Sequence, residues 1–395
     1  MSTISTRLLA AAAAVVAAAL LAGCASGTAV GPSAQADCPT APALALVVPV
    51  HQNAQEPGVP QEWDCALDRA IRDGAPISVV TAEGRPQVLL KGFRADVSAD
   101  NPQAVEDDVV AAKNTVIASV ASASASSAGN DLLGAVALAA DLAPGGQILS
   151  LDNGTTDTGV VRTADEGMTT LVDPADVAQL VVDRGACPAV EGARVQLYSL
   201  GYQVAPAEPI STRQRTRVAQ TWESVLVACG AEVAAVALPR TGEGPAGAYT
   251  TRAIAPEADP AMPALAAASS CEATLPDAVV GFVADEATLL SPADARSAVA
   301  AAARQLAACS GDVQVVGTTS SAGTEAGRAA LSARRAEAVR DLLADALGVP
   351  AGAIAATGLG YDEGPLGGCV VDRVDGVLDP ALAAQNRKVV IRIGG

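Results

Sequence analysis

The stretch that decides the fold of the C-terminal region runs from Val313 to Leu347 and reads VQVVGTTSSAGTEAGRAALSARRAEAVRDLLADAL. Its first apolar residues predict a short strand that ends at Gly317, and a polar turn follows from Thr318 to Gly323. The remaining residues predict a long helix that stops at Gly348, because glycine readily adopts the left-handed conformation of a helix C-cap. The stretch is therefore a strand–turn–helix unit.

Apolar residues recur at helical spacing within this helix and predict a buried stripe made of Leu331, Val339, Leu342 and Ala346. Arg335 lies on the same stripe, whereas Arg334 points about 100° away from it. A buried, unpaired guanidinium would cost several kcal/mol, so Arg335 must meet a carboxylate or carbonyl groups. Two explanations stay open: an internal salt bridge, or a ligand carboxylate held through two hydrogen bonds.

Four motifs in this region occur in a fixed order: G-x-T-x-x-x-G from Gly317, L-S-x-R-R-A-x-x-V from Leu331, G-x-G from Gly358, and N-R-x-V-x-I from Asn386. Their order and spacing resemble the OmpA-like C-terminal domain family over residues 272–395. The resemblance implies a βαβαββ fold that holds peptidoglycan non-covalently through the diamino acid of the stem peptide.

The resemblance also implies ligand residues. The arginine that the family uses for the stem peptide falls on Arg335, and the arginine of the N-R motif falls on Arg387. Ser320, Thr319 and the backbone amides of the turn from Thr318 to Gly323 would complete the pocket. The family has an aspartate where this chain has Ser320, and an asparagine where it has Arg328. This departure is compatible with another diamino acid, with another anionic wall polymer, or with loss of binding.

The N-terminus reads as a targeting segment, Met1 to Gly23, with an apolar run of fifteen residues from Leu8 to Ala22. It ends in Leu-Ala-Gly before Cys24 and resembles a bacterial lipobox, which implies that Cys24 carries the lipid anchor. An ordinary cleaved signal is the alternative. The small residues after it, 24–40, predict a tether. The mature chain is expected outside the cytoplasm, as a membrane-anchored lipoprotein of the cell envelope.

Composition narrows the range of partners. The formal net charge of the chain is −18, and removing residues 1–23 with their single charged residue, Arg7, makes it −19. A chain this acidic is not expected to bind nucleic acid. The length of 395 residues predicts two domains. Only 2% of residues are aromatic, so the cores are expected to consist of Ala, Val and Leu.

The cysteines beyond Cys24 form no C-x-x-C motif, which favours disulfides in an exported protein. We expect three pairs, in each of which the cysteines flank a strand and a neighbouring helix: Cys38 with Cys65, Cys187 with Cys229, and Cys271 with Cys309. Cys369 is left over.

Strands are expected to alternate with helices over residues 41–254. The expected strands are residues 43–50, 77–81, 87–91, 147–151, 195–200 and 232–238, and the expected helices are 60–72, 105–124, 130–142, 173–183 and 211–229. Such alternation with continuous apolar strands predicts a doubly wound, mostly parallel α/β sheet. The layout, with Asn130 opening a helix and the strand–loop from Ile148 to Gly154, resembles a von Willebrand factor A-like (VWA-like) domain. A Pro/Ala/Ser-rich linker is expected at 255–271, and the OmpA-like domain after it is expected to begin with a strand at 279–284.

The VWA-like family often carries a metal site that begins D-x-S-x-S after its first strand. The matching stretch here, Pro49 to Ala54, has neither Asp nor Ser, so we expect no metal. Asp131 and Asp152 are either remnants of such a site or a helix-start residue and a turn former. The domain is left as a scaffold for a protein partner.

We expect no enzyme activity and no cofactor. The single histidine, His51, lies in a polar loop and is expected to be solvated, which leaves a Ser-His-Asp triad without support. No P-loop, G-x-S-x-G or dinucleotide motif is present. The sequence therefore predicts a lipid-anchored protein that tethers the membrane to peptidoglycan or another wall polymer. The alternative is an interaction adaptor whose OmpA-like domain no longer binds peptidoglycan, and an envelope hydrolase using unassigned carboxylates is a distant third.

Overall fold

The computed structural model describes residues 38–97, 101–247, 249–261 and 271–394. All of them except Cys38 belong to one unit, Pro39–Gly395. The predicted signal segment 1–23, the lipid site Cys24, the tether up to residue 37 and the linker residues 262–270 lie outside the described residues.

The N-terminal half of this unit is built on a six-stranded sheet with the order β3-β2-β1-β4-β5-β6. The strands are β1 (Leu44–Pro49), β2 (Ile77–Ala82), β3 (Val88–Phe93), β4 (Gln147–Ser150), β5 (Arg194–Tyr198) and β6 (Glu232–Val236). All neighbouring strands are parallel except β2 and β3, which pair antiparallel at the edge. The sheet is mostly parallel, as the alternation of strands and helices predicted.

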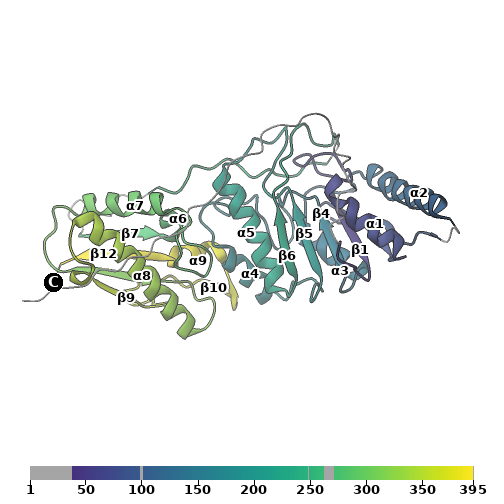
Figure 1. Cartoon of the computed structure of the whole chain (residues 1–395). Coiled ribbons are helices and arrows are strands. Elements are labelled where there is room, and N and C mark those ends of the chain that lie inside the picture. Colours follow the sequence, from purple (N-terminus) through teal and green to yellow (C-terminus); the bar gives the residue numbers. More distant parts are fainter. Residues whose placement is uncertain (1–37, 98–100, 248, 262–270, 395) are drawn as a thin grey trace, which may run out of the picture. The chain divides into compact units, whose positions relative to one another are not determined.

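Helices cover both faces of this sheet (Figure 1). They are α1 (Asp64–Arg72, preceded by the 3-10 turn η1, Gln61–Trp63), α2 (Pro102–Ala121), α3 (Leu132–Leu142), α4 (Pro174–Asp183) and α5 (Thr212–Ala228). Alternate residues of β1 point into two different cores: Leu44, Leu46 and Val48 pack with α1 and α2, whereas Ala45 and Val47 pack with α3, α4 and α5. This explains why β1 reads as an unbroken apolar run.

Helix caps follow the sequence closely, with one exception. Ser211 caps α5 through a capping box with Gln214, and Asp173 caps α4 by accepting a hydrogen bond from the backbone N–H of Ala175. The expectation that Asn130 caps the next helix was wrong, because Asp131 accepts from the Gly134 N–H in that role. The side chain of Asn130 turns toward the sheet edge instead, where it donates to Asp152.

The C-terminal half contains a second sheet with the order β7-β12-β8-β9. Its strands are β7 (Glu272–Pro276), β8 (Val313–Thr318), β9 (Ala355–Gly358) and β12 (Lys388–Ile393), and a small hairpin of β10 (Arg373–Val374) and β11 (Val377–Leu378) stands apart. The central strand β12 pairs antiparallel with both β7 and β8, and β8 pairs parallel with β9. Residues 388–393 therefore join β7 to β8 within the sheet.

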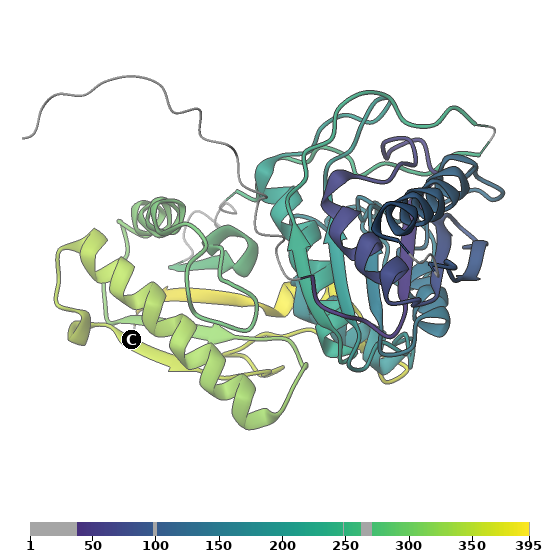
Figure 2. The same ribbon diagram turned by 45° about the vertical axis from the view of Figure 1, so that its right-hand side comes forward.

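The helices of this half are α6 (Asp277–Val280), α7 (Pro292–Gln305), α8 (Glu325–Leu347), the 3-10 turn η2 (Ala351–Ala353) and α9 (Pro380–Asn386). Figure 2 shows the long helix α8, in yellow-green, lying over the strands of this sheet. It packs with α7 and the sheet around Val299, Val315, Ala336, Val339 and Leu343.

Two expectations for this half were wrong. Residues 279–284 were predicted as a strand, but the structure has the short helix α6 and a turn there, with Gly281 in the left-handed conformation; the strand is β7 instead. On α8, Leu331 and Val339 are buried as predicted, but Ala346 is exposed and Leu343 takes its place in the core. The helix ends at Gly348, whose φ of 68° is the left-handed cap that the sequence predicted.

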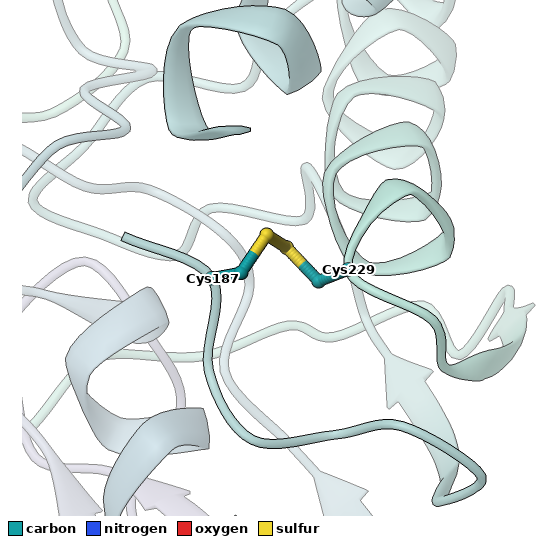
Figure 3. The surroundings of a disulfide bond; sticks show 2 residues. All are labelled: Cys187 and Cys229. Atoms are coloured by element: carbon teal, nitrogen blue, oxygen red, sulfur yellow. A yellow bond between two sulfur atoms is a disulfide. The ribbon is translucent and has the colours of Figure 1, made fainter. Parts of the chain in front are cut away.

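Two disulfides are described with both partners, Cys187–Cys229 and Cys271–Cys309, and these are two of the three predicted pairs. Figure 3 shows the first one joining a loop to the end of α5. Cys38 and Cys65 are each disulfide-bonded, and Cys369 is a free, buried thiol. Within the described ranges no helix has the length and apolar character needed to cross a bilayer.

Candidate functional site

The turn after β8 is held by hydrogen bonds that involve both backbone and side-chain atoms. The hydroxyl of Thr318 donates to the carbonyl of Asn386 at 2.6 Å, and the N–H of Thr319 donates to the carbonyl of Gly360 at 2.9 Å. The N–H of Ser321 donates to Asp372 Oδ2 at 2.8 Å, and Thr324 caps α8. The G-x-T, G-x-G and N-R motifs therefore meet at one place, as their resemblance implied.

Arg335 is committed to internal contacts. Its Nε donates to the carbonyl of Glu286 at 2.8 Å, and its Nη1 lies 3.4 Å from Asp277 Oδ2. Its guanidinium also stacks over the ring of Phe282, 4.9 Å from the centroid. Arg335 is only 2% exposed. Of the two explanations left open by the sequence, the structure shows the internal salt bridge, and the ligand contact of Arg335 stays a prediction.

Arg387 is equally buried, and its partner comes from the other half of the chain. Its Nε donates to Asp176 Oδ2 at 2.7 Å, and its Nη2 donates to Oδ1 of the same carboxylate. Its Nη1 lies 3.4 Å from Asp173 Oδ2. This is a bidentate guanidinium–carboxylate pair, the arrangement in which arginine binds a carboxylate ligand.

Ser320 joins the same pair. Its hydroxyl donates to Asp176 Oδ1 at 2.9 Å, and it is 1% exposed. Thr319 is also buried, and its hydroxyl has no hydrogen-bond partner in the described chain. The predicted site residues Thr319, Ser320 and Arg387 thus line one pocket, and Asp176 of α4 binds two of them, Ser320 and Arg387.

Charges of both signs are buried around this point. The acids are Asp173, Asp176 and Asp277, and the bases are Arg217, Arg335 and Arg387. Burial would raise the pKa of Asp173, but the charges of Arg387, Arg335 and Arg217 and the N–H of Ala175 together outweigh it and hold that pKa below its usual value. Burial opposes the charge on Arg387 as well, yet Asp173 and Asp176 hold its pKa well above the usual value. Burial raises the pKa of Asp176, although Arg387 acts to lower it. The directions for Asp173 and Arg387 are those of an ion pair.

A pocket of about 370 Å³ opens beside this cluster. Its charged and polar walls come from the turn, from α8 and α4, from the loop after α6 and from the end of α9: Gln179, Asp285, Thr319, Ser320, Thr324, Arg328, Arg334 and Arg387. Arg328 donates through Nη1 to the carbonyls of Ser321 and Gly323, and its buried Nε has no partner in the described chain. Arg334 and Asp285 are exposed. The pocket thus offers both bases and an acid to a ligand.

The C-terminal edge of the first sheet carries a second polar cluster. His51 was expected to be solvated, and this was wrong: it is 3% exposed, with its Nε2 at 3.0 Å from Asp152 Oδ2. Asn130 donates to the same carboxylate and to the carbonyl of Thr155. The cluster fills the edge at which parallel sheets usually bind their ligands. No group of metal-ligating side chains occurs among the described residues.

The sequence reasoning missed the acids of α4. Asp173 and Asp176 were visible only as the start of a helix, D-P-A-D, where acidic residues are common because they favour the helix dipole. Both acids are buried in the structure. The apolar periodicity of the sequence does not show which distant residues will contact the first turn of a helix.

Comparisons with known proteins bear on the C-terminal half. The OmpA family model matches residues 281–366. A search of curated proteins finds no match. Among solved structures, the chain is similar to the peptidoglycan-associated lipoprotein from Burkholderia pseudomallei, with 24% identity, 31% of this chain and 89% of that chain covered, and a TM-score of 0.23.

Two further structures are similar. The cell wall anchor of the T6SS from Pseudomonas aeruginosa has 25% identity, with 31% of this chain and 79% of that chain covered and a TM-score of 0.24. The conserved hypothetical protein BatB from Bacteroides thetaiotaomicron has 13% identity, with 50% of this chain and 90% of that chain covered and a TM-score of 0.27. From the family match, the C-terminal part of this chain is an OmpA-family domain.

Proposed function

We propose that this protein is a non-enzymatic, lipid-anchored component of the cell envelope that binds peptidoglycan through its OmpA-family domain. The membrane attachment is the lipid expected at Cys24. The wall attachment is the pocket beside the turn at residues 318–324. Together they would hold membrane and wall at a fixed distance.

The observation that carries this proposal is the charge of the pocket. Its lining includes the bases Arg328 and Arg334 of α8 and the acid Asp285. A diamino acid of a stem peptide carries both carboxylate and ammonium groups, so it needs acceptors and donors within one pocket. Asp285 supplies a carboxylate that Ser320 lacks, and the arginines supply the cationic side.

The N-terminal half is proposed to be VWA-like and to dock a protein partner. The support is its sheet order with one antiparallel edge strand and helices on both faces. The loop that would carry the metal motif holds His51 and Asn53, which are buried and hydrogen-bonded. A scaffold of this kind suits protein binding more than metal-dependent adhesion.

The test is retention of the full chain on purified sacculi from its own organism. Charge reversal at the pocket, Arg328→Glu or Arg334→Glu, and Asp285→Asn are each expected to lower retention severalfold. Arg296→Glu is the matched control, because Arg296 is an exposed arginine on α7 of the same domain and outside the pocket. Equal retention of all four variants and wild type would contradict the pocket as the binding site.

A second function is favoured by one specific observation. Arg387 and Ser320, two of the predicted ligand residues, are both bonded to Asp176. An adaptor that has given up peptidoglycan would use these residues only to join its two halves. In that case wild type and every pocket variant would remain in the supernatant when the sacculi are sedimented, and the search would move to protein partners.

A further inference from the structure

The anion-binding residues of the OmpA-family domain already have an occupant, the N-terminal end of α4. Asp176 accepts two hydrogen bonds from Arg387 and one from the Ser320 hydroxyl. Asp173, at the cap of the same helix, lies 3.4 Å from Arg387 Nη1. Asp176 comes from 211 residues earlier in the chain than the arginine that it binds.

The occupant has the chemistry of a ligand. An acidic small molecule or peptide would offer the same group at this place: a carboxylate that accepts two hydrogen bonds from a guanidinium and one from a hydroxyl. The side chains of Asp176 and Arg387 are 0% and 3% exposed. An external carboxylate therefore cannot bind Nε and Nη2 of Arg387 while Asp176 is in this position.

The exchange of one carboxylate for another preserves the charge pairing. Removing Asp176 alone would leave the Arg387 guanidinium buried without its partner, which is strongly destabilising. A ligand carboxylate that takes the same position restores the ion pair and both hydrogen bonds. Because α4 is packed into the core of the N-terminal half, it would move together with that half. The cost is then the loss of the other contacts between the two halves, among them the pair of Asp183 with Arg373.

The pocket shows where such a ligand would approach. Its walls include Ala175 and Gln179 of α4 together with Arg328 and Arg334 of α8, and Arg387 also lines it. A ligand bound by Arg328 and Arg334 would therefore lie next to α4, whose Asp176 carboxylate it would replace.

We propose that Asp176, assisted by Asp173, is an internal carboxylate ligand of the OmpA-family domain, which an acidic ligand displaces in order to reach Arg387. The site would thus be selective for carboxylates and closed by the N-terminal half until one arrives. This inference rests on the proposed function, because it identifies what controls access to the same binding site.

The experiment compares sacculus retention of the full chain with that of Asp176→Asn and Asp173→Asn, together with amide hydrogen exchange of residues 318–324. Removing the internal competitor is expected to raise retention at least about threefold, because a larger fraction of molecules is then open. Exchange in the turn is expected to rise as well. The control is Asp68→Asn, which breaks an ion pair with Arg72 within α1 and leaves every contact of α4 in place. A circular dichroism melt shows that each variant is folded.

Each outcome decides one point. Unchanged retention and exchange in Asp176→Asn, with Arg328→Glu still defective, would overturn the internal ligand and leave peptidoglycan binding intact. Lower retention in Asp176→Asn would also overturn it, since Asp176 would then be a contact of the ligand. Faster exchange in the turn with no retention of any variant would support the closure and contradict peptidoglycan as the ligand. No retention with unchanged exchange would contradict both.

Discussion

At the scale of single residues, the same side-chain type serves two purposes in this domain. Arg335 and Arg387 both sit in motifs of the OmpA family, and both are buried. Arg335 binds groups of its own domain, whereas Arg387 binds acids of the N-terminal half. A substitution at either position therefore tests stability as well as binding, and the two effects must be separated.

Arg335→Ala is expected to lower the free energy of unfolding by about 3–5 kcal/mol, because it leaves Asp277 and two carbonyls without their buried partner. Burial raises the pKa of Asp277, so this acid loses its charge more readily once the arginine is gone. Urea unfolding followed by circular dichroism measures the change. Arg334→Ala is the control, since Arg334 is exposed one position away. A stable Arg335→Ala protein would contradict the structural role assigned to this arginine.

Ser320→Asp places a second carboxylate against Asp176, in a site where both residues are at most 1% exposed. We expect it to lower the free energy of unfolding by about 2–3 kcal/mol, because two like charges are then buried together. Adding Asp176→Asn to the same protein is expected to return part of this loss. If the double variant is no more stable than Ser320→Asp alone, the two side chains are not in contact in solution.

At the scale of elements, the OmpA-family domain depends on how closely β9 approaches α8. A Cβ built on Gly358 would lie 2.1 Å from the backbone nitrogen of Ala333 and 2.6 Å from Ser332 Oγ. The G-x-G motif thus permits contact between a strand and a helix backbone, which no larger residue allows.

Gly358→Ala is therefore expected to destabilise the domain by about 2–3 kcal/mol through forced separation of β9 and α8. Gly352→Ala, in the nearby turn η2, is the matched control, because a Cβ added to Gly352 would have no other atom within 4 Å. Chemical denaturation of both variants provides the comparison. Equal stability of the two would show that β9 packs less closely against α8 in solution.

At the scale of the whole molecule, α4 contacts the OmpA-family domain at both of its ends. Its N-terminal acids bind Arg387, and Asp183 at its C-terminal end accepts from Arg373 at 2.7 Å and from the Leu378 N–H at 3.0 Å. Although burial acts to raise it, hydrogen bonds from Gln179, Leu378 and Arg373 together hold the pKa of Asp183 below its usual value.

This shift predicts a pH dependence. The folded pKa of Asp183 is lower than its unfolded value of about 3.9, so its stabilising effect is complete above that value and is lost as pH falls through the folded pKa. Asp183→Asn is expected to reduce the free energy of unfolding by about 1 kcal/mol at pH 7, and the difference from wild type should shrink below about pH 4. Asp341→Asn, at an exposed pair on α8, is the control. A difference that stays constant down to about pH 3 would rule out the charge of Asp183 as its cause.

The sequence by itself determined the local structure of this protein. Apolar periodicity, helix caps and the stop at Gly348 placed the strands and helices of the N-terminal half and the unit of β8 and α8, but they missed β7, α6, β10, β11 and α9. The order of four motifs identified the OmpA-family domain, whose family model matches residues 281–366. It also placed Arg335 on the buried side of its helix. These properties depend on residues within one or two turns of each other, where hydrogen-bond geometry and side-chain spacing leave few alternatives.

Only the tertiary structure decided what the buried charges meet. The segment D-P-A-D does not show that Asp176 will bind an arginine 211 residues later. The residues near His51 do not show that its partner will be Asp152. A buried charge requires a partner, but the partner is chosen by the packing of distant elements, because the Coulomb interaction depends on distance in space and not along the chain. For the same reason, the occupied state of the candidate site is a property of the folded molecule and not of its motifs.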